Sequence, residues 1–178
     1  MYPIFRFLFQ SWRASNLPPL EPLGTHVSHH VCWPWDLDLF LELNNGRTLT
    51  LFDLGRIPLG QRAGLLALLK RERWGLTVAG SVVRYRRRVR MFDRIEMRSR
   101  LIGWDARFTY IEQIMLVRGV VTSQAVFRTA VTDAKGIVPT QRLIDALAPG
   151  LATPDLPDWV QAWIAAEDLR PWPPALAG

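Results

Sequence analysis

The most chemically capable side chains of this sequence gather in one short stretch of its first third. Three carboxylates, Asp36, Asp38 and Glu42, precede the tripeptide Asn44-Asn45-Gly46. A positioned carboxylate can attack a carbonyl carbon itself, or it can activate a water molecule to do so. Asn is a good helix N-cap and Gly allows close backbone approach, so the tripeptide predicts a helix start whose N–H groups can stabilise an oxyanion.

The same residue types also fit purely structural roles, and the residues alone leave both interpretations open. Asp is common in turns, so Asp36 and Asp38 fit turn caps, just as Asn44 fits a helix cap. Asp53 and Arg56 stand three positions apart on the expected helix. There they fit a surface ion pair worth about a few tenths of a kcal/mol.

A metal site is not expected. Cys32 is the only cysteine, which excludes an intrachain disulfide and any CxxC pattern. On a strand, alternate side chains point to opposite faces, so His26 and His30 would face one side and His29 the other. We therefore expect no bound metal and no cofactor. Nothing indicates an oxidising compartment, and we expect a cytoplasmic protein.

The elements expected around this stretch are a strand, two helical pieces and then several strands. A strand is expected at about 25–33 and a helix at about 46–57, which Pro58 and Gly60 are expected to end. After a second helical piece at 61–73, β-branched and aromatic residues indicate four strands with short turns between them. These strands are expected at 77–91, 94–103, 107–117 and 120–132. Turns this short force antiparallel neighbours, so the four strands are predicted to form a meander.

The predicted fold class is α+β. One long sheet must bury one of its faces, and the helix after the first strand is the natural filling. A curved antiparallel sheet wrapped around a central helix is the hotdog fold, expected here at residues 25–135. An amphipathic segment and linker at 1–24 precede it. A helical extension at 136–178 follows, with short helices at 141–147 and 159–169.

The polar stretch also carries a recognisable string of residues. It contains Asp-x-Asp at 36–38, Asn-Asn at 44–45, Arg47, and Asp-x-x-Arg at 53–56. In this string the chain resembles the hotdog-fold acyl-CoA thioesterases, especially the 4-hydroxybenzoyl-CoA thioesterase-like branch, and the resemblance covers about residues 25–133. Two positions depart from that branch, which often has His where this chain has Glu42 and Tyr where it has Thr48.

The resemblance implies roles for these residues. Asp38 takes the position of the family's catalytic carboxylate, as nucleophile or base, and Glu42 is an alternate base. The residues implied in substrate binding and in the oxyanion site are Asn44, Asn45, Gly46 and Arg47. The implied substrate is a fatty or aryl acyl-CoA, with coenzyme A as part of the substrate. The implied assembly is a homodimer or homotetramer, because the family's acyl pocket lies at the subunit boundary. The alternative is a non-catalytic hotdog module that binds acyl groups or proteins.

The basic charge of the chain points to an anionic partner. Lys plus Arg number 22 and Asp plus Glu 16, for a net charge of +6. In the segment 83–91, arginines alternate with apolar residues, which predicts a strand with one buried and one cationic face. The apolar positions are Val83, Tyr85, Val89 and Met91, and the arginines are Arg84, Arg86, Arg88 and Arg90. No nucleic-acid-binding motif accompanies the run, so nucleic acid is not expected. A solvated face, a subunit contact or a seat for coenzyme A phosphates fits better.

The N-terminal segment 1–13 has the pattern of an amphipathic helix. Its apolar residues recur at helical spacing, at Ile4, Phe5, Leu8, Phe9 and Trp12. Arg6 interrupts the apolar stretch and no small-residue cleavage site follows, which is unlike a signal peptide. We expect this helix to dock on the domain or on a second subunit, with a peripheral membrane contact as the alternative.

Overall fold

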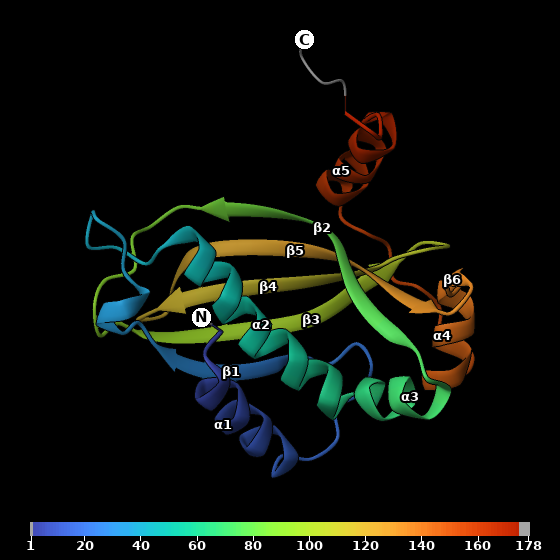
Figure 1. Ribbon diagram of the computed structural model, residues 1–178, viewed down its shortest axis with the longest axis horizontal. Coiled ribbons are helices and arrows are strands. Elements are labelled where there is room, and N and C mark those ends of the chain that lie inside the picture. Colours follow the sequence, from blue (N-terminus) through green and yellow to red (C-terminus); the bar gives the residue numbers. More distant parts are fainter. Residues whose placement is uncertain (1, 175–178) are drawn as a thin grey trace.

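A computed structural model describes residues 2–174 and shows one six-stranded sheet curled around a long helix (Figure 1). Met1 and residues 175–178, parts of the predicted N-terminal segment and C-terminal extension, lie outside the described residues. The strands are β1 (His26–Val31), β2 (Gly75–Tyr85), β3 (Arg94–Trp104), β4 (Thr109–Val117), β5 (Val120–Asp133) and β6 (Gly136–Ile137). The helices are α1 (Ile4–Ser15), α2 (Asn45–Arg62), α3 (Leu65–Glu72), α4 (Thr140–Leu147) and α5 (Asp158–Leu169), with a 3-10 turn, η1 (Pro34–Asp36).

The central helix α2 fills the concave side of the sheet, and the predicted hotdog fold is confirmed (Figure 1). Its side chains Leu51, Phe52 and Leu54 are buried in one apolar core with side chains of β3, β4 and β5. At Gly55 the helix backbone lies close to the sheet. A Cβ at this position would lie 2.6 Å from the Sδ of Met97, well inside van der Waals contact.

The predicted four-strand meander is wrong at its first strand. β3, β4 and β5 are consecutive antiparallel neighbours, but β2 pairs with β5 and β1 pairs with β3, in the order β1-β3-β4-β5-β2. β2 ends at Tyr85 rather than at residue 91. Residues 86–93 then carry the chain across the end of the sheet from the edge strand β2 to β3, which lies next to the other edge strand, β1. The turn signal at 92–93 therefore belongs to a crossing over β4 and β5 and not to a hairpin.

The early end of β2 also changes which side chains are buried. Val89 is buried as predicted, but Tyr85 and Met91 are 45% and 48% exposed. After Tyr85 the strand alternation stops, because the backbone N–H groups of Arg86 and Arg87 both donate to the carbonyl oxygen of Thr122, at 2.8 and 3.1 Å. The two-fold periodicity of a strand no longer applies to this crossing segment.

The predicted end of the central helix at Pro58 is also wrong, because α2 continues to Arg62. A proline inside a helix removes one hydrogen bond and typically costs about 3 kcal/mol. Here Pro58, Leu59 and Gly60 are all buried, so packing of the last turns offsets this local penalty. The helix instead ends before Gly64, whose φ of +79° lies in the left-handed region.

The terminal helices pack against the hotdog domain. On α1, Gln10 is buried and its Nε2 donates to the carbonyl oxygen of His29 at 2.8 Å, so the expected docking on the domain is observed. At the other end, α4 buries Leu143 and Ile144. α5 contacts the sheet through Val160, which is fully buried.

Candidate active site

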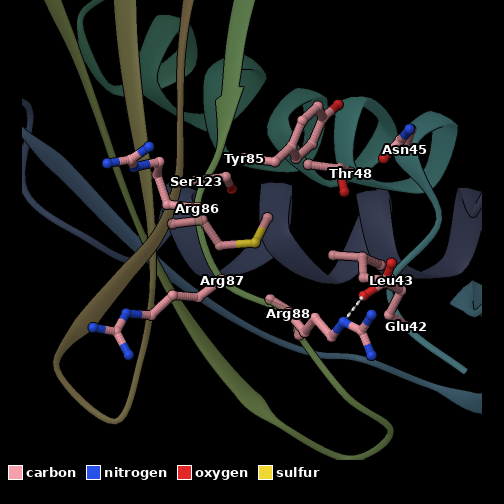
Figure 2. Close-up of a pocket in the computed structure, with 11 residues that line it drawn as sticks. Glu42, Leu43, Asn45, Thr48, Tyr85, Arg86, Arg87, Arg88 and Ser123 are labelled. Carbon is pink, nitrogen blue, oxygen red and sulfur yellow. Dashed lines mark ion pairs between the residues drawn. The ribbon is translucent and has the colours of Figure 1, made fainter.

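A cleft opens at the N-terminal end of α2, between this helix, the end of β2 and the strands β4 and β5 (Figure 2). Its volume is about 250 Å³. The lining residues are Glu42, Leu43, Asn45, Thr48, Tyr85, Arg86, Arg87, Arg88, Val89, Met115 and Ser123. The cleft thus joins part of the polar stretch that the sequence singles out with the arginine run that follows β2.

Glu42 is the carboxylate of the polar stretch that lines this cleft. It pairs with Arg88, whose Nε lies 2.9 Å from Glu42 Oε2, as the dashed line in Figure 2 marks. The two side chains are 30% and 70% exposed, so the pair is open to solvent and to a ligand. Exposed pairs of this kind are weak, at about 1 kcal/mol or less, so an entering anion can exchange for the carboxylate.

Asp38 lies outside the residues that line the cleft and orders the turn that carries Glu42. Its Oδ1 accepts hydrogen bonds from the backbone N–H groups of Phe40, at 2.8 Å, and Glu42, at 3.3 Å. Leu41, inside this turn, has a φ of +59°, a conformation that non-glycine residues rarely adopt. The carboxylate of Asp38 therefore compensates a strained turn by bonding its backbone.

Asp36 is a buried anchor between the N-terminal helix and the domain. It is 2% exposed, and one of its oxygens lies 2.7 Å from Arg6 NH1. The same oxygen accepts the backbone N–H of Trp33 at 3.1 Å, while Arg47 Nε lies 3.9 Å from the other oxygen. These contacts hold α1, η1 and the start of α2 together, which is a structural use of this carboxylate.

The start of α2 divides the predicted binding residues between two surfaces. Asn44 is the N-cap, and its Oδ1 accepts the N–H groups of Gly46, at 2.9 Å, and Arg47, at 3.2 Å. Those two N–H groups are engaged in the cap. Asn45 lines the cleft, whereas Asn44, Gly46 and Arg47 line a separate pocket that also contains Trp35.

Two hydroxyl groups in the cleft were not among the predicted site residues. Thr48, on the first turn of α2, and Ser123, on β5, are both buried and point toward the cavity from opposite sides (Figure 2). Thr48 Oγ1 donates to the carbonyl oxygen of Asn44 at 3.2 Å. Ser123 Oγ has no hydrogen-bond partner among the described residues, although the side chain is only 3% exposed. A buried hydroxyl without a partner is costly, which makes Ser123 Oγ a candidate to bind a ligand or a water molecule in the cleft.

The rim of the cleft is cationic. Figure 2 shows the side chains of Arg86 and Arg87 extending outward from the cleft, on the side opposite α2. Both are exposed, as is Arg88. Guanidinium groups bind phosphate oxygens well because their planar fork matches the geometry of the anion. This rim therefore fits a phosphorylated ligand whose reactive end enters the cleft.

Arg56 forms a buried layer with Gln113 of β4 at the middle of α2, and its partner Asp53 is half-buried, so this is not an ordinary surface pair. Arg56 is 9% exposed, pairs with Asp53, and its NH1 donates to Gln113 Oε1 at 3.2 Å. The guanidinium also lies 4.0 Å from the ring centroid of Phe127. Burial raises the pKa of Asp53 and lowers that of Arg56, while their mutual attraction opposes both shifts.

A second cavity lies beyond this layer, near the C-terminal end of α2. It is lined almost entirely by apolar side chains, among them Leu59, Leu65, Leu66, Leu143 and Leu147, and its volume is about 80 Å³. The layer of Arg56 and Gln113 therefore separates a polar cleft at one end of the helix from an apolar cavity at the other.

The histidines of β1 alternate as predicted. His26 and His30 are buried and His29 is exposed. Burial lowers the pKa of His30 to about 3 and that of His26 to about 4, and nearby arginines add to both shifts. Within residues 2–174, no group of three His, Cys, Asp or Glu side chains is placed to hold a metal ion.

Residues 32–164 match the Thioesterase-like superfamily. Protein THEM6 of Xenopus laevis is 29% identical over 148 residues, which cover 82% of this chain and 70% of that protein. Among solved structures, the probable thioesterase YbaW from Escherichia coli superposes with a TM-score of 0.65 at 17% identity, over 71% of this chain and 99% of that one. Slr0204, a 1,4-dihydroxy-2-naphthoyl-CoA thioesterase from Synechocystis, gives a TM-score of 0.60 at 11% identity, over 70% and 96% of the two chains.

Proposed function

We propose that this chain, which belongs to the thioesterase-like superfamily, hydrolyses an acyl-CoA thioester in the cleft at the N-terminal end of α2. The predicted hotdog fold and the prediction of a thioester hydrolase agree with this family. One observation carries the proposal to the cleft: a solvent-accessible carboxylate, Glu42, lies in the same cavity as the unpartnered hydroxyl of Ser123. An anion-binding rim of arginines borders this cavity.

In the proposed reaction, Glu42 acts as the general base. Its carboxylate takes a proton from a water molecule while the water oxygen bonds to the thioester carbonyl carbon. The hydroxyl of Ser123 donates a hydrogen bond to the oxyanion that develops, which satisfies its otherwise unused O–H group. The C–S bond then breaks, and the thiolate takes up the proton held by Glu42. The products are the free acid and coenzyme A.

Asp38, which takes the family's catalytic position, is proposed to act through the turn that carries Glu42. Its hydrogen bonds to Phe40 and Glu42 fix the backbone of this turn. Nucleophilic attack by Asp38 itself is the competing mechanism. The two mechanisms differ in which carboxylate takes part in the chemistry. In the first it is Glu42 and Asp38 is needed only for its hydrogen bonds, whereas in the second it is Asp38.

The remaining parts of the proposal concern binding and assembly. The exposed arginines Arg86, Arg87 and Arg88 are proposed to receive the phosphates of coenzyme A. β2 pairs with β5 on one side, and in residues 2–174 no strand covers its other side. A second copy is proposed to pair along this edge, which gives a homodimer or, from two dimers, a homotetramer. Light scattering on the purified protein distinguishes these states.

The alternative function is non-catalytic binding of acyl groups. The apolar cavity near Leu65 and Leu143 supports it, because nearly all of its lining is hydrocarbon and it holds no reactive group at its centre. Under this alternative Glu42 is a remnant, and the protein binds acyl-CoA without turnover. Equilibrium binding with no release of thiol would favour this function over hydrolysis.

The deciding experiment measures thiol release from short-chain, long-chain and aryl acyl-CoAs. Glu42→Gln removes the proposed base but keeps the size of the side chain, and we expect a rate loss of about a hundredfold or more. Asp38→Asn keeps an oxygen that accepts the turn's hydrogen bonds, so it should retain most of the activity. Glu96→Gln, in an exposed pair with Arg98 at 2.7 Å, is the matched control.

Opposite results have clear meanings. Activity lost in Asp38→Asn but retained in Glu42→Gln would assign the chemistry to Asp38. A folded wild-type protein that binds acyl-CoAs and releases no thiol from any of them would overturn the hydrolase proposal.

A further inference from the structure

The outer face of α1 is unusually apolar for a surface that contacts solvent. α1 packs on the domain through Gln10 and Ala14, and most of its large apolar side chains point away from the domain. Phe5 is 89% exposed and Trp12 is 63% exposed. A helix whose apolar side faces outward presents a surface suited to bind an apolar partner.

This apolar surface continues beyond α1. Phe9 borders the same groove as Trp33, and Trp33 stacks on Trp35 with ring centroids 5.5 Å apart. Phe92, from the crossing segment, meets the Trp33 ring edge-on at 6.1 Å. We call this surface the aromatic face. It consists of Ile4, Phe5, Leu8, Phe9, Trp12, Trp33, Trp35 and Phe92, all of which are at least 37% exposed.

The charges around the aromatic face are mostly positive. α1 contains no acidic residue, and of its two arginines Arg6 is paired with Asp36 while Arg13 is exposed, 5.9 Å from the Phe9 ring centroid. Arg94 and Arg118 line the groove between Phe9 and Trp33, and Arg118 NH2 lies 3.7 Å from a carboxylate oxygen of Asp93. Glu96 is the carboxylate of this groove, and it is held by Arg98 at 2.7 Å. The surface around the apolar side chains therefore attracts anions.

We propose that the aromatic face binds the surface of a bilayer that contains anionic phospholipids. Amphipathic helices with large apolar side chains and basic neighbours lie in the interfacial plane of membranes, and Trp is favoured at that depth. α1 is suited to lie on the membrane and not to cross it, since no helix in residues 2–174 is long and apolar enough to span a bilayer. Arg94 and Arg118 would meet lipid phosphates in the groove.

A second copy of the chain fits this face less well. Two identical faces carry the same excess of positive charge, and like charge on both partners disfavours association. A bilayer with anionic headgroups offers complementary charge together with a hydrocarbon layer for the exposed rings. This inference does not depend on the proposed thioesterase activity.

The test is sedimentation of the full chain with vesicles of phosphatidylcholine alone, or of phosphatidylcholine mixed with phosphatidylglycerol. Wild-type protein should bind the mixed vesicles more strongly, and added salt should weaken binding. The double variant Phe5→Ser/Trp12→Ser changes only exposed side chains, so the fold should persist, as circular dichroism will show. We expect this variant to bind about tenfold or more weakly.

The control is Leu169→Ser, which removes an equally exposed apolar side chain (85%) from α5. It should bind vesicles like the wild type. Absence of wild-type binding to anionic vesicles at low salt would overturn the proposal, as would equal binding by the double variant. A double variant that loses an oligomeric state in light scattering, with no vesicle binding by the wild type, would instead make this face a contact between copies.

Discussion

The N-terminal end of α2 and its middle treat polar groups in opposite ways. At the N-terminal end, Ser123 keeps a buried hydroxyl without a protein partner, and Glu42 is held by a solvent-exposed arginine. Beside the middle of the helix, Gln113 of β4 is fully buried, and both its amide nitrogen and its amide oxygen are hydrogen-bonded. Its Nε2 donates to Phe52 O and Ser99 Oγ, both at 2.8 Å, and its Oε1 accepts from Arg56.

This difference distinguishes groups available for chemistry from groups that fix the fold, along the string of residues from Asp36 to Arg56. Polar groups that satisfy each other fix a structure, whereas buried polar groups left unsatisfied are available to a ligand. The Asp53–Arg56 half of the motif therefore serves the fold, although its pKa shifts resemble those of a reactive site. The half that contains Glu42 and Asn45 faces the cleft.

The largest effect is expected from Gln113→Leu. This change leaves Arg56 and the carbonyl oxygen of Phe52 without their buried partner, and we expect a loss of about 3 kcal/mol in the free energy of unfolding. Gln124→Leu is the control, because its Nε2 contacts one carboxylate oxygen, on Glu112 at 2.7 Å, in a less buried place. The free energy of unfolding of both variants is measured by urea denaturation. A similar small loss in both would remove the distinction between the N-terminal end and the middle of the helix.

A slightly smaller effect is expected from Gly55→Ala. The added Cβ would lie 2.6 Å from Met97 Sδ and 2.9 Å from Ser99 Oγ, and both side chains are fully buried. We expect destabilisation by about 2 kcal/mol. Gly60→Ala, on the same helix, meets its nearest atom at 3.5 Å and should be neutral or stabilising, since Ala is the better helix former. Equal thermal stability of the two variants would contradict the close approach of α2 to the sheet.

Stability should also fall in acid through the histidines of β1. In the native state the pKa values of His30 and His26 are lowered to about 3 and about 4 from the ordinary value of 6.5. Between these lower values and pH 6.5, the two side chains take up protons in the unfolded chain but stay neutral in the native state. Their contribution is complete above pH 6.5 and declines as the pH falls toward these lower values. We expect a loss of about 2 kcal/mol by about pH 5.8, which grows as the pH falls further. His30→Gln should make this decline shallower, and His29→Gln, at an exposed position, should leave it unchanged.

The smallest effect on stability is expected from Ser123→Ala. The hydroxyl has no partner to lose, so the free energy of unfolding should change by less than about 0.5 kcal/mol. Under the proposed function, thiol release should nevertheless drop about tenfold or more, mainly in kcat. A large loss of stability would show that this hydroxyl is structural and that the N-terminal end and the middle of the helix do not differ.

The sequence predicted the parts of this fold that depend on local signals. The start of α2 at Asn44, the consecutive pairing of β3, β4 and β5, and the C-terminal helices all follow from caps, short turns and periodicity. The partner of β2 did not follow, because the crossing at 86–93 looks locally like a turn. The helix passed through Pro58 because burial of its neighbours outweighs a local penalty that the sequence alone shows.

The candidate site was predictable only where residues are adjacent in the chain. Glu42 and Asn45 stand in a recognisable string, and both line the cleft. Ser123 lies on a strand far along the chain, and no motif marks it. Only the pairing of β5 beside β4 brings it to the start of α2. Its inward position follows from strand alternation, but its lack of a partner requires the packed structure.

The contact between Gly55 and the sheet has a consequence for how this protein can change. A helix pinned at its midpoint can neither slide nor rotate without displacing buried side chains on β3. We therefore expect differences in ligand preference to arise mainly from the segments that flank the cleft, at 38–42 and 86–93. These two segments can change in sequence while α2 and the sheet keep their positions. Grafting them between relatives should transfer selectivity while the barrel-like body stays the same.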